Sequence, residues 1–309
     1  MDGIVPLYKE RGMTSNDCVF KVRRILHMKK VGHSGTLDPN VDGVLPICIG
    51  QATKVVDQLV HSGKVYTGEI TLGLSTTTED LDGEVVEEAR LTEPFSTERI
   101  KETLASFLGD SIQIPPMFSA VKVNGRRLYD YARAGDPVER PQRSITITQF
   151  DLDGEPQFDA ESGRQTFRFI VGCSKGTYIR TLAVDFGRKL GLPAVMSDLT
   201  RLKSGGIQIG NCITLEQLAQ KAEAGELADV LLPIDHVFED YKKIALDDDQ
   251  WAKLLNGVFL TLPEQTDEIV ALTYQGHIKA LYQVEKAAQH LYRPYKMYLQ
   301  PRDSLKKTR

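Results

Sequence analysis

Strands with alternating apolar residues are interleaved with amphipathic helices over the first three quarters of the chain, and this order constrains the fold most strongly. Alternation in VYTGEITLG (65–73) predicts a strand with one buried face. SITITQFDL (144–152) and QTFRFIVG (165–172) predict two more strands joined by a polar loop. The core is therefore expected to mix strands and helices.

The predicted helices have recognisable starts and ends. TSND (14–17) supplies N-cap residues ahead of apolar residues at helical spacing. The same criteria predict helices over 96–109 with a terminal glycine, 178–191 ending at Gly191, and 214–225 with a Thr/Gln capping box. Periodicity weakens between about 226 and 246, and we interpret this segment as a linker.

Chain length predicts one large domain and one small one, because single cores stop growing at roughly 250–300 residues and this chain has 309. Residues 247–285 combine a short capped helix with three brief strands, which indicates a compact β module after the linker. Residues 111–143 have no steady period. An irregular insertion of that length is typical of a functional loop or of a disordered one.

The net charge of −4 is unevenly distributed. Residues 1–33, 111–143 and 286–309 carry seven, six and seven basic residues against three, three and one acidic ones, whereas residues 79–110 hold ten acids against three bases. Three separated basic segments fit a polyanion bound along one face. Solvated surface charge explains them equally well at this level.

Several classes of protein are excluded by what the sequence lacks. No apolar run approaches the roughly 18–20 residues of a membrane helix, and no signal segment opens the chain, so a cytoplasmic protein is expected. The glycine motifs of nucleotide sites are absent and no H-x-x-x-H spacing occurs, so neither a nucleotide nor a metal is expected. TEDLDG (78–83) only imitates a calcium loop and is predicted to form a turn.

Asp38 is the main candidate for chemistry. It lies in GHSGTLDPNVDG (32–43), where an aspartate before proline is ordinarily a turn residue that accepts hydrogen bonds from nearby backbone N–H groups. The loop runs from a basic helix into the apolar stretch GVLPICIGQATK (43–54), which could hold it rigidly. An attacking carboxylate is therefore the second interpretation.

Five segments, in the same order, resemble the bacterial tRNA pseudouridine synthases of the TruB family. They are GHSGTLDP with GVLPICIGQATK, KVYTGEITLG, IPPMFSAVKVNGRRLYDYAR, CSKGTYIRTLAVDFGRKLG and DLTRLKSG. The resemblance implies an α+β catalytic domain over 1–237, with a mixed, largely antiparallel sheet flanked by helices and an RNA-binding insertion at about 111–143. It also implies a small β-rich, PUA-like RNA-binding domain over 238–309.

The resemblance implies an isomerase that converts the uridine at position 55, in the T loop of transfer RNA, to pseudouridine without a cofactor. Asp38 matches the attacking carboxylate, and Arg180 matches the arginine that pairs with it. Tyr66 matches the residue that stacks on the base and can move a proton. The implied contacts to the RNA or its flipped base are His33, Tyr178, Leu199, Lys122, Arg126 and Arg127.

The chemistry of the residues fits these roles. Uracil is a better leaving group than a sugar alcohol and no water enters the reaction, so one carboxylate can replace the acid and base pair of glycosidases. A neighbouring guanidinium is expected to lower the pKa of Asp38 and to hold it through bidentate bonds. Outside the motif, Tyr66 would be interpreted as a core residue and Arg180 as a surface charge.

The chain also departs from the family pattern, since YKERG replaces D-K-P-x-G at 8–12 and SAVK replaces S-A-L-K at 119–122. Two rival functions stay open. One is an RNA-binding folding factor without chemistry, and the other is a hydrolase with Asp38 as nucleophile, for which no second carboxylate stands at a suggestive spacing. A monomer is expected, with its C-terminal module either contacting the acceptor stem or merely covering the core.

Overall fold

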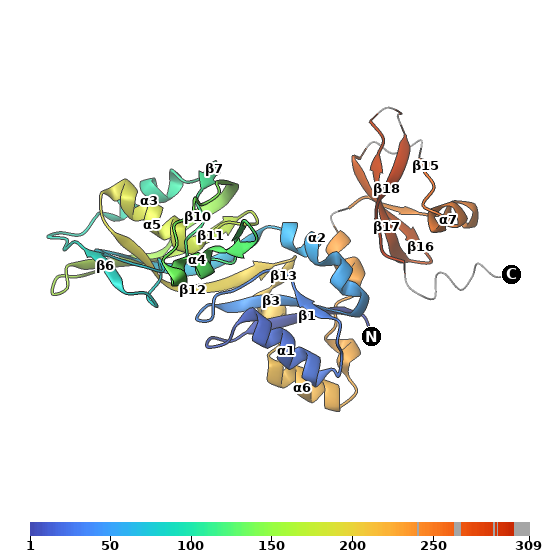
Figure 1. Ribbon diagram of the computed structural model, residues 1–309, viewed down its shortest axis with the longest axis horizontal. Helices are drawn as coiled ribbons and strands as arrows, with labels where there is room; N and C mark the ends of the chain where they lie inside the picture. The colour runs from blue at the N-terminus through green and yellow to red at the C-terminus, as the bar shows by residue number, and fades with distance from the viewer. Residues whose placement is uncertain (240, 263–266, 287, 289, 300–309) are drawn as a thin grey trace.

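The computed structural model describes residues 1–239, 241–262, 267–286, 288 and 290–299. Figure 1 shows an elongated molecule in which a larger body of mixed strands and helices carries a small β domain at one end, beyond α2. The architecture confirms the expected α+β class. No helix within these described ranges has the length and apolar character needed to cross a bilayer.

A nine-stranded sheet forms the body in the described part of the chain, with its main path in the order β1-β3-β12-β4-β11-β10-β7. Its neighbours are antiparallel except β3 and β12, which run parallel. The sheet is therefore mixed and largely antiparallel, as expected. Its strands are β1 (Gly3–Lys9), β2 (Val31–His33), β3 (Asp42–Ile49), β4 (Lys64–Leu72), β7 (Gly109–Gln113), β10 (Arg143–Asp159), β11 (Arg164–Cys173), β12 (Ala194–Ser204) and β13 (Ile207–Gln208).

The parallel contact between β3 and β12 requires a glycine. Gly43 has a φ of +110°, and a Cβ built there would lie 2.2 Å from the carbonyl oxygen of Arg201. A side chain would therefore force the two strands apart. This close approach brings the loop that precedes β3 next to β12.

The helices begin and end largely where their caps predict. Thr14 and Asp17 form a capping box on α1, Thr214 and Gln217 form another on α6, and Gly191 with a φ of +77° ends α5. In Figure 1, α3 and α5 lie together near β10 and β11, whereas α1 and α6 lie beside β1. The helices are α1 (Ser15–Ile25), α2 (Val56–His61), α3 (Thr97–Ala105), α4 (Leu128–Ala134), α5 (Ile179–Leu190), α6 (Leu215–Glu223) and α7 (Asp248–Leu255).

Two predictions about the middle of the chain need correction. Helix α3 ends at Ala105 rather than at Gly109, because Gly109 already begins strand β7, which pairs with β10. The insertion at 111–143 is not irregular throughout, since it contains the two-stranded hairpin of β8 (Lys122–Val123) and β9 (Arg126–Arg127), followed by α4. These elements are too short to give a periodic sequence signal.

The segment at 226–246 is not a free linker. Ile4 and Leu232 exchange two backbone hydrogen bonds of 2.9 Å, and the side chain of Phe238 is fully buried. Phe238 packs against Tyr298 of the C-terminal domain, with ring centroids 5.0 Å apart. Packing against both parts of the molecule thus orders a stretch whose sequence lacks periodicity.

The C-terminal domain contains a five-stranded sheet in its described residues, with the order β14-β16-β17-β18-β15. The strands β15, β16 and β17 and helix α7 were expected, whereas β14 and β18 were not. Residues 300–309, the end of the predicted basic tail, lie outside the described residues. The remaining strands of the molecule are β5 (Leu74–Thr76), β6 (Val85–Glu88), β14 (Lys243–Ala245), β15 (Leu260–Thr261), β16 (Ile269–Tyr274), β17 (His277–Val284) and β18 (Leu291–Met297).

Candidate active site

One pocket of about 250 Å³ brings together most of the residues singled out from the sequence. It lies where β4 begins, β11 ends and α5 starts, beside the parallel contact of β3 and β12. Asp38, Tyr66, Tyr178, Arg180 and Leu199 all line it. Segments as far apart in the chain as residues 38 and 199 thus form one site.

The loop around Asp38 is held by groups other than its carboxylate. The buried ammonium of Lys9 donates to the carbonyl of Val41 at 2.7 Å, and the hydroxyl of Ser15 accepts from the N–H of Leu37 at 2.9 Å. The turn itself closes when the N–H of Val41 donates to the carbonyl of Asp38 at 3.1 Å. The side chain of Asp38 is therefore not needed for the turn.

Arg180 connects this loop to two others. Its side chain is only 6% exposed, and its Nε lies 3.1 Å from Oδ2 of Asp38. Its other donors reach the carbonyls of Thr78 at 2.8 Å and Phe118 at 2.9 Å. Arg180 is thus not a surface charge. The contact between Arg180 and Asp38 runs through Nε, whereas the two Nη groups donate to backbone carbonyls, so the structure does not show the bidentate pairing that was expected.

A second carboxylate, Asp80, lies 3.5 Å from Nη1 of Arg180 and is one of the residues that sequence reasoning missed. TEDLDG does form the predicted turn, in which Asp80 accepts from the hydroxyl of Thr78 at 2.5 Å and from the N–H of Asp82 at 3.1 Å. A separation of 42 residues from Asp38 gives no local signal. The sequence showed no second carboxylate at a suggestive spacing from Asp38, and the fold places Asp80 against the same arginine.

The pKa of Asp38 is raised above its ordinary value, which overturns the expected direction. Desolvation by the surrounding protein is the largest cause of the raised pKa, because it disfavours the charged carboxylate even though 42% of the side chain stays exposed. The guanidinium of Arg180 lowers this pKa, whereas the charge of Asp80 raises it. The effect of desolvation on the pKa of Asp38 outweighs that of the ion pair. The presence of a guanidinium alone therefore did not predict the direction of the pKa shift.

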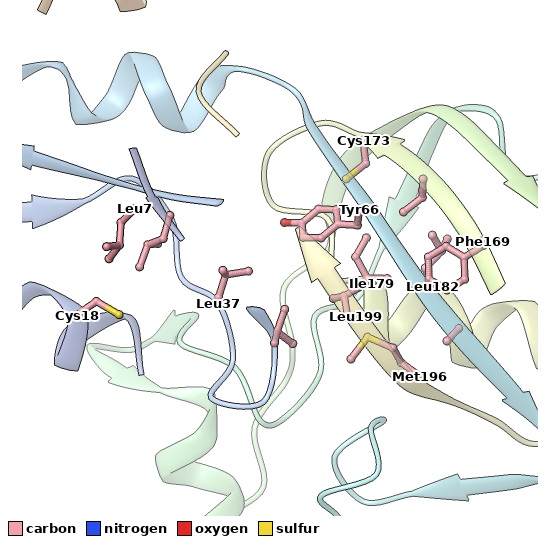
Figure 2. Packing of buried hydrophobic residues seen from close by; sticks show 14 of the residues in the cluster. Leu7, Cys18, Leu37, Tyr66, Phe169, Cys173, Ile179, Leu182, Met196 and Leu199 are labelled. Carbon is pink, nitrogen blue, oxygen red and sulfur yellow. The ribbon is translucent and has the colours of Figure 1, made fainter. Parts of the chain in front are cut away.

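Tyr66 is both a core residue and a wall of the pocket. It is 7% exposed, and burial raises the pKa of its hydroxyl. Figure 2 shows its ring between Cys173 and Leu199, with the hydroxyl pointing away from Phe169. The apolar side therefore anchors the ring, while the hydroxyl faces the side on which Leu37 lies.

Tyr178 and His33 occupy different positions relative to the pocket. The backbone of Tyr178, immediately before α5, exchanges hydrogen bonds with the side chain of Gln113 at 2.8 and 3.0 Å. His33 ends β2, and its Nδ1 accepts from the N–H of Gly35 at 3.2 Å. Burial, together with the charge of Arg201, lowers the pKa of His33. His33 lies next to the Asp38 loop rather than among the residues that line the pocket.

The three basic residues of the insertion lie outside the pocket, on the β8–β9 hairpin. Lys122 is exposed, and Arg126 pairs with Asp136 at 2.5 Å and stacks over Tyr131. Arg127 contacts the hydroxyl of Tyr129. Because Ser119 and Ala120 line the pocket, the hairpin follows directly from its wall.

Two further cations line the pocket and were not predicted. Lys64 is 8% exposed and Arg201 is 1% exposed. Nothing in their local sequence distinguishes them from ordinary strand residues. Across the described ranges, His, Cys, Asp and Glu side chains form no group of three or more placed to hold a metal ion.

At residues 8–12 the sequence reads YKERG instead of the family pattern D-K-P-x-G, and other contacts support the loop around Asp38 there. Tyr8 donates a hydrogen bond of 2.5 Å to Asp42, the first residue of β3, which also accepts from Thr200 at 2.6 Å. Lys9 keeps its contacts to the loop. The replaced acid and proline are therefore compatible with an ordered site.

Comparisons with known proteins agree with this geometry. The family description "TruB family pseudouridylate synthase (N terminal domain)" matches residues 23–179, and "tRNA pseudouridylate synthase B C-terminal domain" matches 180–239. A protein of Latilactobacillus sakei named tRNA pseudouridine synthase B is 89% identical over 97% of this chain and 98% of its own length. One of the same name from Pediococcus pentosaceus is 60% identical over 97% and 99%.

The fold also resembles a solved structure. The crystal structure of a Cbf5-Nop10-Gar1 complex contains a chain that is 26% identical, with a TM-score of 0.72 over 97% of this chain and 86% of that one. Together with the two family descriptions, which cover residues 23–239, and the high identity to full-length relatives, this settles the family. The chain belongs to the TruB family of pseudouridylate synthases.

Proposed function

We propose that this protein is a tRNA pseudouridine synthase that isomerises the uridine at position 55, in the T loop of transfer RNA. The names of its relatives support the tRNA substrate. The observation that carries the proposal is the contact of 3.1 Å between Asp38 and Arg180, in a pocket walled by Tyr66 and Leu199. One carboxylate is thereby held at a site large enough for one nucleoside.

The reaction needs little more than such a site. The bond between N1 of uracil and C1′ of ribose breaks, the base turns, and a bond forms between C5 and C1′. The hydrogen on C5 then leaves as a proton, and N1 gains one, so the atoms balance without a cofactor. Asp38 acts as an ionised carboxylate, whether by adding to the ring, attacking C1′ or removing a sugar proton. Tyr66 stacks on the base and accepts or relays a proton.

A T-loop uridine is stacked within folded RNA, so it must be flipped out to reach the pocket. In our proposal His33 occupies the vacated stacking position, and Tyr178 and Leu199 contact the flipped base. The hairpin residues Lys122, Arg126 and Arg127 contact phosphates next to the pocket. We also propose that the C-terminal domain binds the acceptor stem of the transfer RNA.

The proposed domain division places the catalytic domain at 1–237 and the PUA-like domain at 238–309. Support comes from the two separate sheets, one built from strands up to Gln208 and the other from strands after Lys243. We propose that the enzyme acts as a monomer in the cytoplasm, where transfer RNA is modified.

The proposal is tested with T-arm stem–loop RNA that carries tritium at C5 of its uridines. Wild-type protein should release tritium, and nearest-neighbour analysis should locate pseudouridine at position 55. Asp38→Asn should release none while binding the RNA within about threefold of wild type, because the change removes a charge but little volume. Asp151→Asn, an exposed carboxylate on β10, is the matched control and should keep full activity.

The rival functions give different results. Undiminished tritium release by Asp38→Asn would refute the assignment of the catalytic carboxylate. Binding and refolding of RNA without any release, by wild type as well, would favour the folding factor. Release of free uracil would favour the hydrolase.

A further inference from the structure

The pocket contains more positive charge than its proposed chemistry uses. Among the described residues that line the pocket, Asp38 is the only one with a carboxylate. Four of them carry a cationic side chain, namely Lys64, Lys175, Arg180 and Arg201. Arg180 is paired with Asp38. The remaining cations therefore lack a counter-charge in the pocket itself.

Lys64 is nearly buried and is held by neutral groups. Its Nζ donates to the carbonyls of Val60 at 3.0 Å and Ser62 at 3.3 Å, at the end of α2. An ammonium has three N–H groups, so these two bonds leave one donor for a ligand. Burial and the charges of Arg201 and Lys175 lower the pKa of Lys64 to about 8. The neighbouring protein thus destabilises this positive charge rather than compensating it.

Arg201, on the adjacent strand β12, is likewise buried and held by neutral groups. Its Nε donates to the carbonyl of Val44 at 2.7 Å, and its Nη2 lies 3.4 Å from the carbonyl of Gly35. In the part of the chain that the structure describes, no carboxylate lies within 4.0 Å of the charged nitrogens of Arg201 or Lys64. Buried charges in proteins are ordinarily paired, so these two indicate an anion that the protein itself does not supply.

Gly35 leaves both cations open to the pocket. A Cβ at this position would lie 3.8 Å from Nη1 of Arg201 and 3.9 Å from Cε of Lys64. A side chain at position 35 would therefore pack directly against both cations, and glycine places none there. The ribose and uracil of a nucleotide are neutral, and its phosphodiester is the group that carries negative charge.

We propose that Lys64 and Arg201 form a phosphate subsite that binds a phosphate flanking the flipped uridine. This inference rests on the proposed function and adds a role to the same pocket. During the reaction the base leaves C1′ and turns, so contacts to the base cannot hold the sugar in place. An anchored phosphate keeps C1′ beside Asp38 while the base is detached. Lys64 and Arg201 are in this sense substrate-positioning residues.

The test removes the charge either from a phosphate of the RNA or from Lys64 of the protein. T-arm RNAs are made with one uncharged methylphosphonate linkage on the 5′ side of the target uridine, on its 3′ side, or in the stem. A 2′-O-methyl ribose precedes each linkage in the charged and uncharged RNAs alike. RNA affinity and kcat/KM are measured for wild type, Lys64→Met and Lys203→Met. Lys203 is the matched control, because it lies on the same strand as Arg201 but does not line the pocket.

For wild type, one flanking methylphosphonate should lower kcat/KM about 10- to 100-fold, as expected for a charge-assisted hydrogen bond. Lys64→Met should cause a similar loss with the charged RNA and no more than about threefold further loss with that uncharged RNA. Lys203→Met should keep the full penalty of the uncharged linkage. The slope of RNA affinity against salt concentration should fall by the equivalent of about one phosphate contact in Lys64→Met and should stay unchanged in Lys203→Met.

The subsite is refuted if, at both flanking linkages, the loss of kcat/KM caused by Lys64→Met and the loss caused by the uncharged linkage combine in full. It is also refuted if wild type tolerates both uncharged linkages, a result that needs no folded variant. Failure of the proposed function is recognised separately, because wild type would then release no tritium from unmodified RNA. In that case RNA affinity still reports whether a flanking phosphate is bound by Lys64.

Discussion

Replacing Arg180 by lysine is the most informative perturbation of the site, because it keeps the charge and removes the planar fork. Arg180 contacts two carboxylates, Asp38 and Asp80, and donates to two backbone carbonyls, and these four groups come from three different loops. A lysine ammonium can satisfy only part of this set, since its donors radiate from one atom. The substitution thus separates the geometry of the guanidinium from its charge.

The expected magnitudes follow from the lost contacts. The carbonyls of Thr78 and Phe118 lose their donor, and a buried acceptor without a partner costs about 1–3 kcal/mol. For two such acceptors we therefore expect Arg180→Lys to lower the free energy of unfolding by about 2–6 kcal/mol. Loss of the orienting bond to Asp38, about 1.5–3 kcal/mol, should lower kcat about 10- to 200-fold. RNA affinity should stay within about threefold, because the contacts of Arg180 go to groups of the protein itself.

Tritium release under saturating RNA gives kcat, and urea unfolding gives the free energy of unfolding. Arg188→Lys is the matched control, since its side chain lies on the same helix and is 71% exposed. It should change the free energy of unfolding by less than about 0.5 kcal/mol. If folded Arg180→Lys keeps kcat within twofold of wild type, the guanidinium does not orient Asp38 and the reasoning is wrong.

Two further predictions concern protonation. Asp80→Asn should lower the pKa of Asp38, because the charge of Asp80 raises it; the acidic limb of the kcat profile should then move to lower pH, and an unmoved or raised limb would contradict this. Tyr8→Phe should reduce the free energy of unfolding by about 1–2 kcal/mol, since Tyr8 donates to Asp42. That bond raises the pKa of Tyr8 from 10.0 to about 12, so its contribution is present below pH 10 and is lost as pH rises to 12. The stability gap between wild type and Tyr8→Phe should therefore narrow over this range, and a constant gap would disprove the linkage.

Local features of the fold were predictable because their causes are local. The capping boxes that begin α1 and α6 and the glycine that ends α5 act within four residues of the helix end. Strand alternation identified β4, β10 and β11. The end of α3 was misplaced because strand pairing of Gly109 with β10 overrides helical periodicity. The packed segment around Phe238 was missed because its order comes from distant partners.

The candidate site was predictable only in part. Four segments that resemble the family, namely GHSGTLDP, KVYTGEITLG, GTYIR and DLTRLKSG, identified Asp38, Tyr66, Tyr178, Arg180 and Leu199, and the structure brings all five to one pocket. How each of them contributes to the reaction stays a proposal. His33 and the basic residues of the insertion lie outside the pocket lining, so their roles stay predictions for the RNA complex.

The sequence by itself determined the family, the mixed fold and the candidate carboxylate Asp38, because these are encoded in periodicity, caps and contiguous motifs. Tertiary structure alone decided what surrounds that carboxylate. Asp80 reaches Arg180 from 42 residues beyond Asp38, through a turn, and Arg201 reaches the pocket from 163 residues beyond Asp38, through a parallel strand contact. Desolvation depends on all the atoms that exclude water, so the raised pKa of Asp38 and the unpaired charges of Lys64 and Arg201 exist only in the folded chain.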